Sequence, residues 1–257
     1  MRELENKVAL VTGASRGIGR GITEALAADG AMVIVHFGRN SEAAAETVAA
    51  ITSRGGAAFP LQADLASAED IERFFLVLDE QLTMQKGTNR LDILVNNAGI
   101  ASSASYREMS AAQFDHLFAV NVRGAFLMTQ AAIGRIRAGG RIINISSLAS
   151  RHAAPSPMVP PYSMTKAALD AFTLGLAQDL GPLNITANVL APGPVGTDIN
   201  SQFFSKPGMR IGIDEQTALR HRHGGGHRKP GALPCLEPEP ADNRSIHRCQ
   251  RRIPLVG

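Results

Sequence analysis

Cysteine is absent from residues 1–219 of this 257-residue chain, since Cys235 and Cys249, its two cysteines, both lie near the carboxyl end. A region without cysteine has neither a disulfide framework nor a thiol nucleophile. Apolar runs as long as a membrane span are also missing, and the first residues lack the apolar core and small-residue cleavage site of a secretory signal. These absences predict a cytoplasmic protein with no membrane partner.

Excess charge is missing from most of the chain as well. Residues 1–219 carry 18 basic against 20 acidic side chains, and residues 220–257 carry eight against three, so the formal net charge of +3 comes from the last segment alone. The high isoelectric point is therefore no sign of nucleic-acid binding by the first 219 residues. The length and an apolar content of 44% fit one large domain or two small ones.

Short apolar runs alternate with helix-period segments through residues 1–219. Strands are predicted over 7–13, 31–37, 57–65, 91–99, 140–147 and 185–193. Helices are predicted over 19–30, 41–56 (with Ser41 as N-cap), 67–82, 110–136 and 162–181. Strands this apolar, separated by helices, predict a parallel sheet covered on both faces. The expected fold is a single three-layer α/β/α domain with a Rossmann-type, doubly wound sheet.

The stretch TGASRGIG, Thr12–Gly19, lies between the first predicted strand and the first predicted helix. Glycine permits the tight turn and lets a pyrophosphate approach the backbone, while the helix N-terminus supplies N–H donors and positive potential. A glycine pattern alone also fits an ordinary strand–helix turn. Here strand, turn and helix occur in the required order at the first βα unit, which favours a dinucleotide site at Gly13, Gly17 and Gly19.

An acidic residue is missing from the end of the second predicted strand, where NAD sites hold the ribose hydroxyls. That position is Phe37, with Arg39 just beyond it and Arg16 inside the glycine turn. A carboxylate would repel a 2′-phosphate, whereas two guanidinium groups would bind it. The sequence therefore favours NADP(H) over NAD(H), with two solvated arginines as the alternative.

Tyr162 and Lys166 lie four residues apart at the start of a predicted helix and so share one face. A tyrosine with a pKa of about 10 is a poor acid–base catalyst at neutral pH, and a nearby ammonium group would bring that pKa toward the working range. Ser147, at the end of the fifth predicted strand, could hydrogen-bond a substrate carbonyl. Asn121 could hold a water that relays protons through Lys166. A surface contact is the alternative for the Tyr–Lys pair.

Together these motifs resemble the short-chain dehydrogenase/reductase family. The resemblance covers residues 5–219 and includes Asp64 after the third predicted strand, NNAG at 96–99 and PG at 192–193. It implies hydride transfer between a nicotinamide and a carbonyl or secondary alcohol carbon. The glycine turn and the arginines are similar to those of NADPH-dependent reductases, including reductases of 3-oxoacyl thioesters. The implied catalytic residues are Asn121, Ser147 (with Ser146 as the alternative serine), Tyr162 and Lys166.

The same resemblance implies the contacts of the cofactor, with Asp64 at the adenine ring and Lys166 at the nicotinamide ribose. No metal is expected. The implied cofactor-binding residues are Gly13, Ser15, Arg16, Gly17, Ile18, Gly19, Arg39, Asp64, Leu65, Asn97, Ala98, Gly99, Tyr162, Lys166, Pro192, Gly193 and Thr197. A homotetramer or homodimer that acts on a small molecule and has no nucleic-acid partner would be typical. A non-catalytic dinucleotide-binding protein or inactive relative is the alternative function.

Residues 220–257 depart from the family pattern. They hold four of the seven histidines and five of the 14 prolines, and they contain no strand-like run. Read one base later, codons allowed for residues 246–254 encode Ser-Ile-Asp-Val-Ser-Gly-Gly-Phe, which resembles the usual family ending. We therefore expect a reading-frame change just after Leu219 and a basic, disordered or poorly packed tail in place of a native last strand and helix. A zinc site and a nucleic-acid-binding tail are the alternatives.

Overall fold

The computed structural model describes residues 2–102, 104, 107–150 and 160–193. The chain divides into two units, residues 1–191 and 192–257, and the sheet with its helices belongs to the first. The predicted domain boundary at residue 219 lies outside the described residues. No helix in the described part of the chain is long and apolar enough to cross a membrane.

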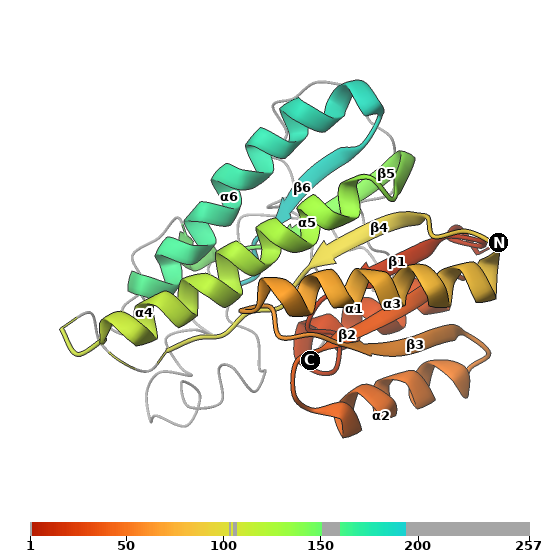
Figure 1. The fold of residues 1–257 in the computed structure, drawn as a ribbon, viewed down its shortest axis with the longest axis horizontal. Helices are drawn as coiled ribbons and strands as arrows, with labels where there is room; N and C mark the ends of the chain where they lie inside the picture. The colour runs from red at the N-terminus through yellow and green to blue at the C-terminus, as the bar shows by residue number, and fades with distance from the viewer. Residues whose placement is uncertain (1, 103, 105–106, 151–159, 194–257) are drawn as a thin grey trace, which may run out of the picture. The chain divides into compact units, whose positions relative to one another are not determined.

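Six parallel strands form one sheet in the order β3-β2-β1-β4-β5-β6, as Figure 1 shows. The strands are β1 (Val8–Val11), β2 (Met32–Phe37), β3 (Ala57–Gln62), β4 (Leu91–Asn96), β5 (Ile136–Ile145) and β6 (Thr186–Leu190). The order runs outward in both directions from β1 and β4, so the predicted Rossmann-type, doubly wound sheet is confirmed.

Helices cover both faces of the sheet. They are α1 (Gly17–Ala28), α2 (Ser41–Thr52), α3 (Ala68–Lys86), α4 (Ala111–Phe118), α5 (Ala125–Ile133) and α6 (Pro160–Leu180). Helices α3, α5 and α6 lie side by side on one face, and α1 packs beside α2 on the other (Figure 1). A π-helical segment, Ala119–Gly124, joins α4 to α5, and short 3-10 turns span Leu148–Ser150 and Gly181–Leu183.

The core lies along β1, β2 and β4, which are buried over their whole length. Because helices cover both sides of these strands, apolar residues occur in continuous runs rather than in alternation. The outer strands β3 and β6 are only partly buried. Helix α3 contributes Phe74, Leu78 and Leu82 to the same core cluster, and all three side chains are almost fully buried.

Several boundaries differ from the sequence predictions, most clearly between α5 and β5. The helix predicted over residues 110–136 ends at Ile133, and β5 begins at Ile136 rather than at residue 140. The early start is possible because Gly139 adopts a positive φ and its N–H donates to the Asn184 carbonyl at 2.7 Å. The N-cap of α2 is Asn40 rather than Ser41, because the Asn40 side chain accepts the hydrogen bond from Ala43 N–H at 2.9 Å.

Candidate active site

Many of the predicted site residues lie where the carboxyl ends of β1, β4 and β5 meet. The glycine turn follows β1, residues 97–99 follow β4, and Ser146 and Ser147 follow β5. Since neighbouring parallel strands end at the same edge of a sheet, these three segments lie next to one another. This is the edge at which doubly wound sheets bind their ligands.

The glycine turn packs so closely against the segment after β4 that side chains are excluded. Gly13 has a φ of +61°, and a Cβ on it would lie 2.8 Å from Ala98 Cα. A Cβ on Gly19 would lie 2.2 Å from the Gly13 carbonyl oxygen and 2.4 Å from Asn97 Nδ2. Helix α1 begins at Gly17, so its first backbone N–H groups, which have no partner within the helix, are at this turn. Such a cradle fits the pyrophosphate of a dinucleotide.

Hydrogen bonds made by the side chains of Thr12 and Asn97 join the turn to the segment after β4. The Thr12 hydroxyl oxygen accepts hydrogen bonds from the N–H groups of Asn97 and Ala98 at 2.9 and 3.0 Å. In return, Asn97 Nδ2 donates to the carbonyl oxygens of Thr12 and Gly13 at 2.8 and 3.0 Å. On the other side, the Ser15 carbonyl accepts from the Thr47 hydroxyl of α2 at 3.2 Å. The backbone around the glycine turn is therefore held from both sides.

The region predicted to bind the adenosine end has the expected charge. Phe37 is the last residue of β2 and is buried, while Arg16 and Arg39 are exposed at the adjacent ends of β1 and β2. Asp64 is exposed just after β3, and its Oδ1 accepts from Ala66 N–H at 2.9 Å. Leu65 is buried against the Gly124 backbone. Two cations and an apolar strand end fit a 2′-phosphorylated adenosine better than a bare ribose.

Tyr162, Ser147 and Lys166 meet at the start of α6. The Tyr162 hydroxyl shares a hydrogen bond with the Ser147 side chain. Lys166 is 3% exposed, and its Nζ donates to the Ile145 carbonyl at 2.8 Å and lies 5.6 Å from the centre of the Tyr162 ring. Ser146 instead donates to the Lys166 carbonyl at 3.1 Å. The geometry thus brings Ser147, and not Ser146, to the phenol.

Burial is the main cause of the pKa shifts of Tyr162 and Lys166. It raises the pKa of Tyr162 above its usual value, and the hydrogen bond with Ser147 offsets part of that rise. It lowers the pKa of Lys166 to about 8, opposed by the charge of Asp170. The sequence predicted that the ammonium would lower the tyrosine pKa, but desolvation of the phenolate raises that pKa here. Tyr162 is therefore a neutral phenol at neutral pH, ready to donate a proton.

Asn121 lies in the π-helical segment and is fully buried. Its Oδ1 accepts from Ile100 N–H at 2.8 Å, and its Nδ2 donates to the Ile100 carbonyl at 2.9 Å and to the Thr165 hydroxyl at 3.1 Å. These bonds use both amide hydrogens of Asn121, so a relay water would have to donate to an oxygen, either to the second lone pair of Oδ1 or to the Asn121 carbonyl. A Cβ on Gly99 would lie 3.4 Å from Asn121 Oδ1 and 3.5 Å from Lys166 Nζ, which places all three at one point.

Sequence reasoning missed two side chains that support Ser147. The Ser150 hydroxyl lies 2.8 Å from the Ser147 carbonyl oxygen and 2.8 Å from Asp170 Oδ2. Asp170 follows Lys166 by four residues, so it lies on the same face of α6. The spacing alone could have indicated Asp170, whereas nothing in the sequence indicates Ser150.

The role of each predicted site residue stays a prediction, and some of these residues lie outside the contacts given above. Ile18 lies half-buried in the first turn of α1. Pro192 and Gly193 are described but belong to the second unit, and Thr197 lies outside the described residues. Within the described ranges, no group of three His, Cys, Asp or Glu side chains is placed to hold a metal ion.

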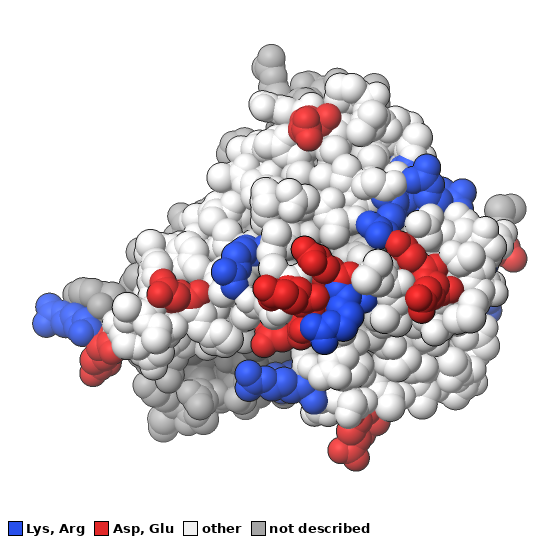
Figure 2. All heavy atoms as spheres, viewed as in Figure 1, with Lys and Arg blue, Asp and Glu red and all other residues white. Residues whose placement is uncertain are grey.

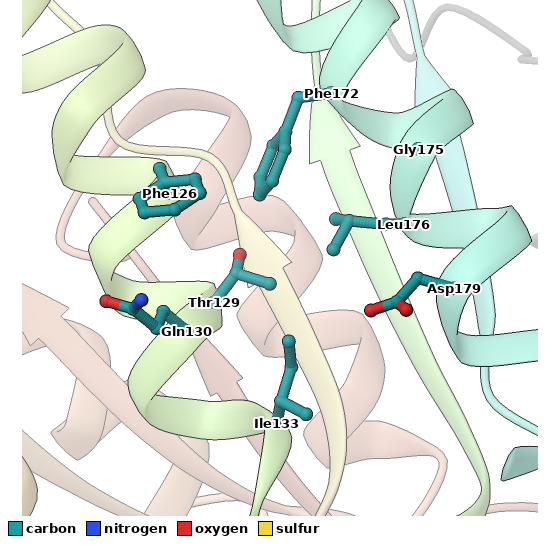
Figure 3. Close-up of a pocket in the computed structure, with 8 residues that line it drawn as sticks. All are labelled: Phe126, Thr129, Gln130, Ile133, Phe172, Gly175, Leu176 and Asp179. Atoms are coloured by element: carbon teal, nitrogen blue, oxygen red, sulfur yellow. The ribbon is translucent and has the colours of Figure 1, made fainter.

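A groove of about 370 Å³ separates α5 from α6, as Figure 3 shows. None of its lining residues belongs to the predicted site. Helix α5 carries no charged residue, and the surface over α5 and α6 is largely uncharged in Figure 2, whereas acidic and basic side chains intermingle lower on the same face. The lining residues are Phe126, Thr129, Gln130, Ile133, Phe172, Gly175, Leu176 and Asp179.

Comparison with known proteins places the fold and site in context. Residues 7–208 match the family model of the short chain dehydrogenases. An uncharacterized oxidoreductase of Methylorubrum extorquens is 42% identical over 220 residues, which cover 85% of this chain and 86% of the relative. A 3-oxoacyl-[acyl-carrier-protein] reductase of Synechocystis is 37% identical over 209 residues, covering 80% of this chain and 81% of that enzyme.

A solved structure is similar as well. The angucycline C-6 ketoreductase LanV, crystallised with bound NADP, superposes with a TM-score of 0.77 and is 41% identical. The match covers 82% of this chain and 80% of that one.

Proposed function

The chain belongs to the short-chain dehydrogenases, and from that membership we propose that it is an NADP(H)-dependent oxidoreductase that interconverts a carbonyl group and a secondary alcohol. One observation carries the proposal. A neutral, largely buried phenol, Tyr162, shares a hydrogen bond with Ser147 and lies one helical turn from the buried Lys166, at the sheet edge that also holds the glycine cradle.

The chain's own residues account for binding and proton transfer. The glycine turn and the first N–H groups of α1 would hold the pyrophosphate, and Arg16 and Arg39 the 2′-phosphate. The bound nicotinamide supplies a hydride to the substrate carbon or accepts one from it. Tyr162 donates its proton to the substrate oxygen, and the Ser147 hydroxyl orients that oxygen. Lys166, charged below its pKa of about 8, then stabilises the phenolate that remains.

Preference for NADP(H) rests on the two arginines and is supported by the NADP bound in LanV. Replacing Arg39 with Ala removes a charge-assisted contact, so the Kd for NADPH should rise about tenfold or more while the Kd for NADH stays unchanged. Fluorescence titration of each reduced nucleotide measures both constants. Equal effects on the two nucleotides would contradict the assignment.

The substrate is a ketone or its alcohol, and a 3-oxoacyl thioester or a small ketone is the class that we propose to test first. One relative reduces 3-oxoacyl groups on acyl carrier protein and another acts at C-6 of an angucycline, so both thioesters and cyclic ketones belong in the panel. Loss of NADPH absorbance with each ketone measures turnover. NADPH binding without turnover on any member of a broad panel would favour the non-catalytic alternative.

We also propose that two copies associate through α5 and α6. Phe126 is 46% exposed at the groove between α5 and α6, where its ring contacts that of Phe172, and burying it against a second copy would remove it from water. Sedimentation of wild type should show a dimer or larger assembly, and Phe126→Arg should reduce it to monomer. Met84→Arg is the control, since Met84 is 71% exposed and belongs to α3, which contributes no residue to the groove. The contact would be refuted if both variants sedimented as monomers, or if both sedimented like the wild type.

For residues 220–257 we propose a change of reading frame after Leu219. The excess of basic residues, histidine and proline and the family-like reading one base later support it. Resequencing this part of the gene tests it directly, because codons that cannot give the alternative reading would exclude it. A frame-restored chain, assayed beside this one, would show how much activity and stability the native ending contributes.

A further inference from the structure

His36 is a polar residue in the fully buried strand β2. Its side chain is 2% exposed, and every other residue of the strand, from Met32 to Phe37, is apolar. Burying an imidazole is costly unless both ring nitrogens find hydrogen-bond partners. The ring therefore has to satisfy two partners at once.

The two ring nitrogens contact different segments of the chain. Nδ1 lies 3.1 Å from Gly13 N, whose hydrogen it accepts, and Nε2 lies 3.2 Å from the Ala63 carbonyl oxygen. A backbone N–H can only donate and a carbonyl oxygen can only accept. One neutral tautomer, with the hydrogen on Nε2, satisfies both contacts. The imidazolium would direct a second N–H at Gly13.

These two partners border the two ends of the proposed dinucleotide site. Gly13 begins the turn that would hold the pyrophosphate, and Ala63 directly precedes Asp64, at the adenine end. The main chain reinforces the connection, since Ala14 N–H donates to the His36 carbonyl at 2.9 Å. The Phe74 ring of α3 meets the imidazole edge-on at 5.6 Å between centres, which restricts rotation of the imidazole.

We propose that His36 is a positioning residue for the cofactor: its imidazole ties the phosphate-binding turn to the adenine-binding segment and fixes their separation before the dinucleotide arrives. This inference rests on the proposed NADP(H) site. The Gly13 N–H is committed to His36, and the Ala14 N–H to its carbonyl. These two N–H groups are therefore not available to a phosphate, which would have to bind further along the turn and at the start of α1.

A matched pair of variants separates positioning from simple packing. In His36→Asn the amide oxygen can occupy the place of Nδ1 and keep the bond to Gly13, while the donor to Ala63 is lost. In His36→Gln the amide nitrogen can reach the place of Nε2 and keep the bond to Ala63, while Gly13 N–H loses its acceptor. Each variant leaves one buried backbone group unpaired, so both should lose similar thermal stability.

Two ligands report on the two ends of the site. NADPH spans both, and adenosine 2′,5′-bisphosphate carries the adenine without the pyrophosphate. We expect His36→Gln to bind NADPH about tenfold more weakly than wild type, with a smaller loss for the bisphosphate, because the freed turn must be ordered by the ligand. His36→Asn should weaken both ligands equally, by about threefold. At saturating NADPH, kcat should stay within about twofold in both.

Several outcomes would overturn the inference. Wild-type affinity for NADPH in both variants, with equal losses of stability, would make His36 a packing residue only. A fall in kcat without a change in NADPH affinity would place its role in the chemical step. If wild type itself bound no NADPH, the proposed function would fail, which is a different result.

A measurement on the unaltered protein covers the case in which the variants do not fold. Nitrogen NMR of histidine-labelled wild type should show one buried imidazole with hydrogen on Nε2 and a bare Nδ1, and NADP⁺ binding should shift that signal. A buried imidazole with hydrogen on Nδ1, or a doubly protonated one, would refute the arrangement.

Discussion

The two halves of the sheet build the candidate site by different means. Around β1, β2 and β3 the glycines leave no room for a side chain, and hydrogen bonds between backbone groups and the side chains of Thr12, His36 and Thr47 hold the turn. Around β4, β5 and β6 buried amides and hydroxyls carry the structure. Asn96 Nδ2 donates to Thr129 and Asn144, and Asn144 Nδ2 donates to Thr173, all at 2.8 Å.

The difference follows from what each half has to do. A phosphate chain is recognised by backbone N–H groups, which any sequence supplies once the turn is tight enough. Proton transfer needs particular side chains at particular places, and these are held by further side chains. Mutations in the first half should therefore act mainly on cofactor affinity, and mutations in the second half mainly on turnover.

Tyr162→Phe should have the largest effect on turnover of any change around β4, β5 and β6. Loss of the proton donor should lower kcat by about 10²- to 10⁴-fold while the Kd for NADPH stays unchanged. Steady-state kinetics and fluorescence titration measure the two quantities. Ser163→Ala, one residue along the same helix, is the control and should retain activity. Turnover in Tyr162→Phe at the wild-type rate would remove Tyr162 from the mechanism.

Gly19→Ala should lower both stability and NADPH affinity, because it changes the turn after β1. The new Cβ would meet the Gly13 carbonyl oxygen at 2.2 Å, and because backbone cannot move aside easily, stability should fall by about 3 kcal/mol and the Kd for NADPH should rise at least tenfold. Gly21→Ala is the matched control on the same helix, since its Cβ would meet nothing within 4 Å. Urea unfolding and NADPH titration compare the two variants. Similar behaviour of both would show that the turn is less tightly packed than described.

Acid should destabilise the cofactor half through His36, whose pKa burial lowers to about 4. Below a pH of about 6.5 this histidine is protonated in the unfolded chain but still neutral in the folded chain. The free energy of unfolding therefore falls as the pH falls toward about 4. Between pH values of about 7 and 5, wild type should lose about 2 kcal/mol more than His36→Asn, which cannot titrate there. Urea unfolding at the two pH values tests this, and equal losses would contradict a neutral buried ring.

Asp170→Asn should have the smallest effect on turnover, and it tests how the residues around Lys166 and Ser147 are held. The carboxylate raises the pKa of Lys166, so its removal should shift the alkaline limb of the pH–rate profile to lower pH. It also holds Ser147 through Ser150, so kcat should fall about threefold to tenfold.

Two further variants divide these effects. Ser150→Ala should lower kcat without the pH shift, because it removes only the hydrogen bonds. Asp179→Asn, an exposed residue on the same helix, should change neither quantity. A pH shift of equal size in Asp179→Asn would indicate a general charge effect rather than a local one.

Local patterns were enough to predict the sheet and the elements that carry the site. Buried parallel strands and capped helices have distinct periods, so the six strands and the glycine turn could be found from the sequence. Asn121, Ser147, Tyr162 and Lys166 could be named as candidates because their spacing and strand ends resemble those of the family, and their catalytic roles stay predictions. The preference for NADP(H) from Phe37, Arg16 and Arg39 is supported by the NADP bound in a solved relative.

Features set by distant partners could not be predicted. Asn40 and Ser41 are both good N-caps, and only the backbone conformation decides between them. The roles of His36 and Asn121 depend on residues 27 and 44 positions away in the chain, namely Ala63 and Thr165. The ionisation of Tyr162 was predicted in the wrong direction because spacing shows the lysine but not the depth of burial.

The π-helical segment between α4 and α5 accommodates one extra residue in one long helix. A π turn holds one residue more than an α turn for nearly the same rotation, whereas each residue of an α-helix advances the face by about 100°. Deleting one residue other than Asn121 from Ala119–Gly124 would therefore restore α geometry while α5 keeps the face on which Thr129 contacts Asn96. The same deletion at the start of α5 would turn the rest of that helix by about 100°, so single-residue deletions should be better tolerated in the π-helical segment than in α5.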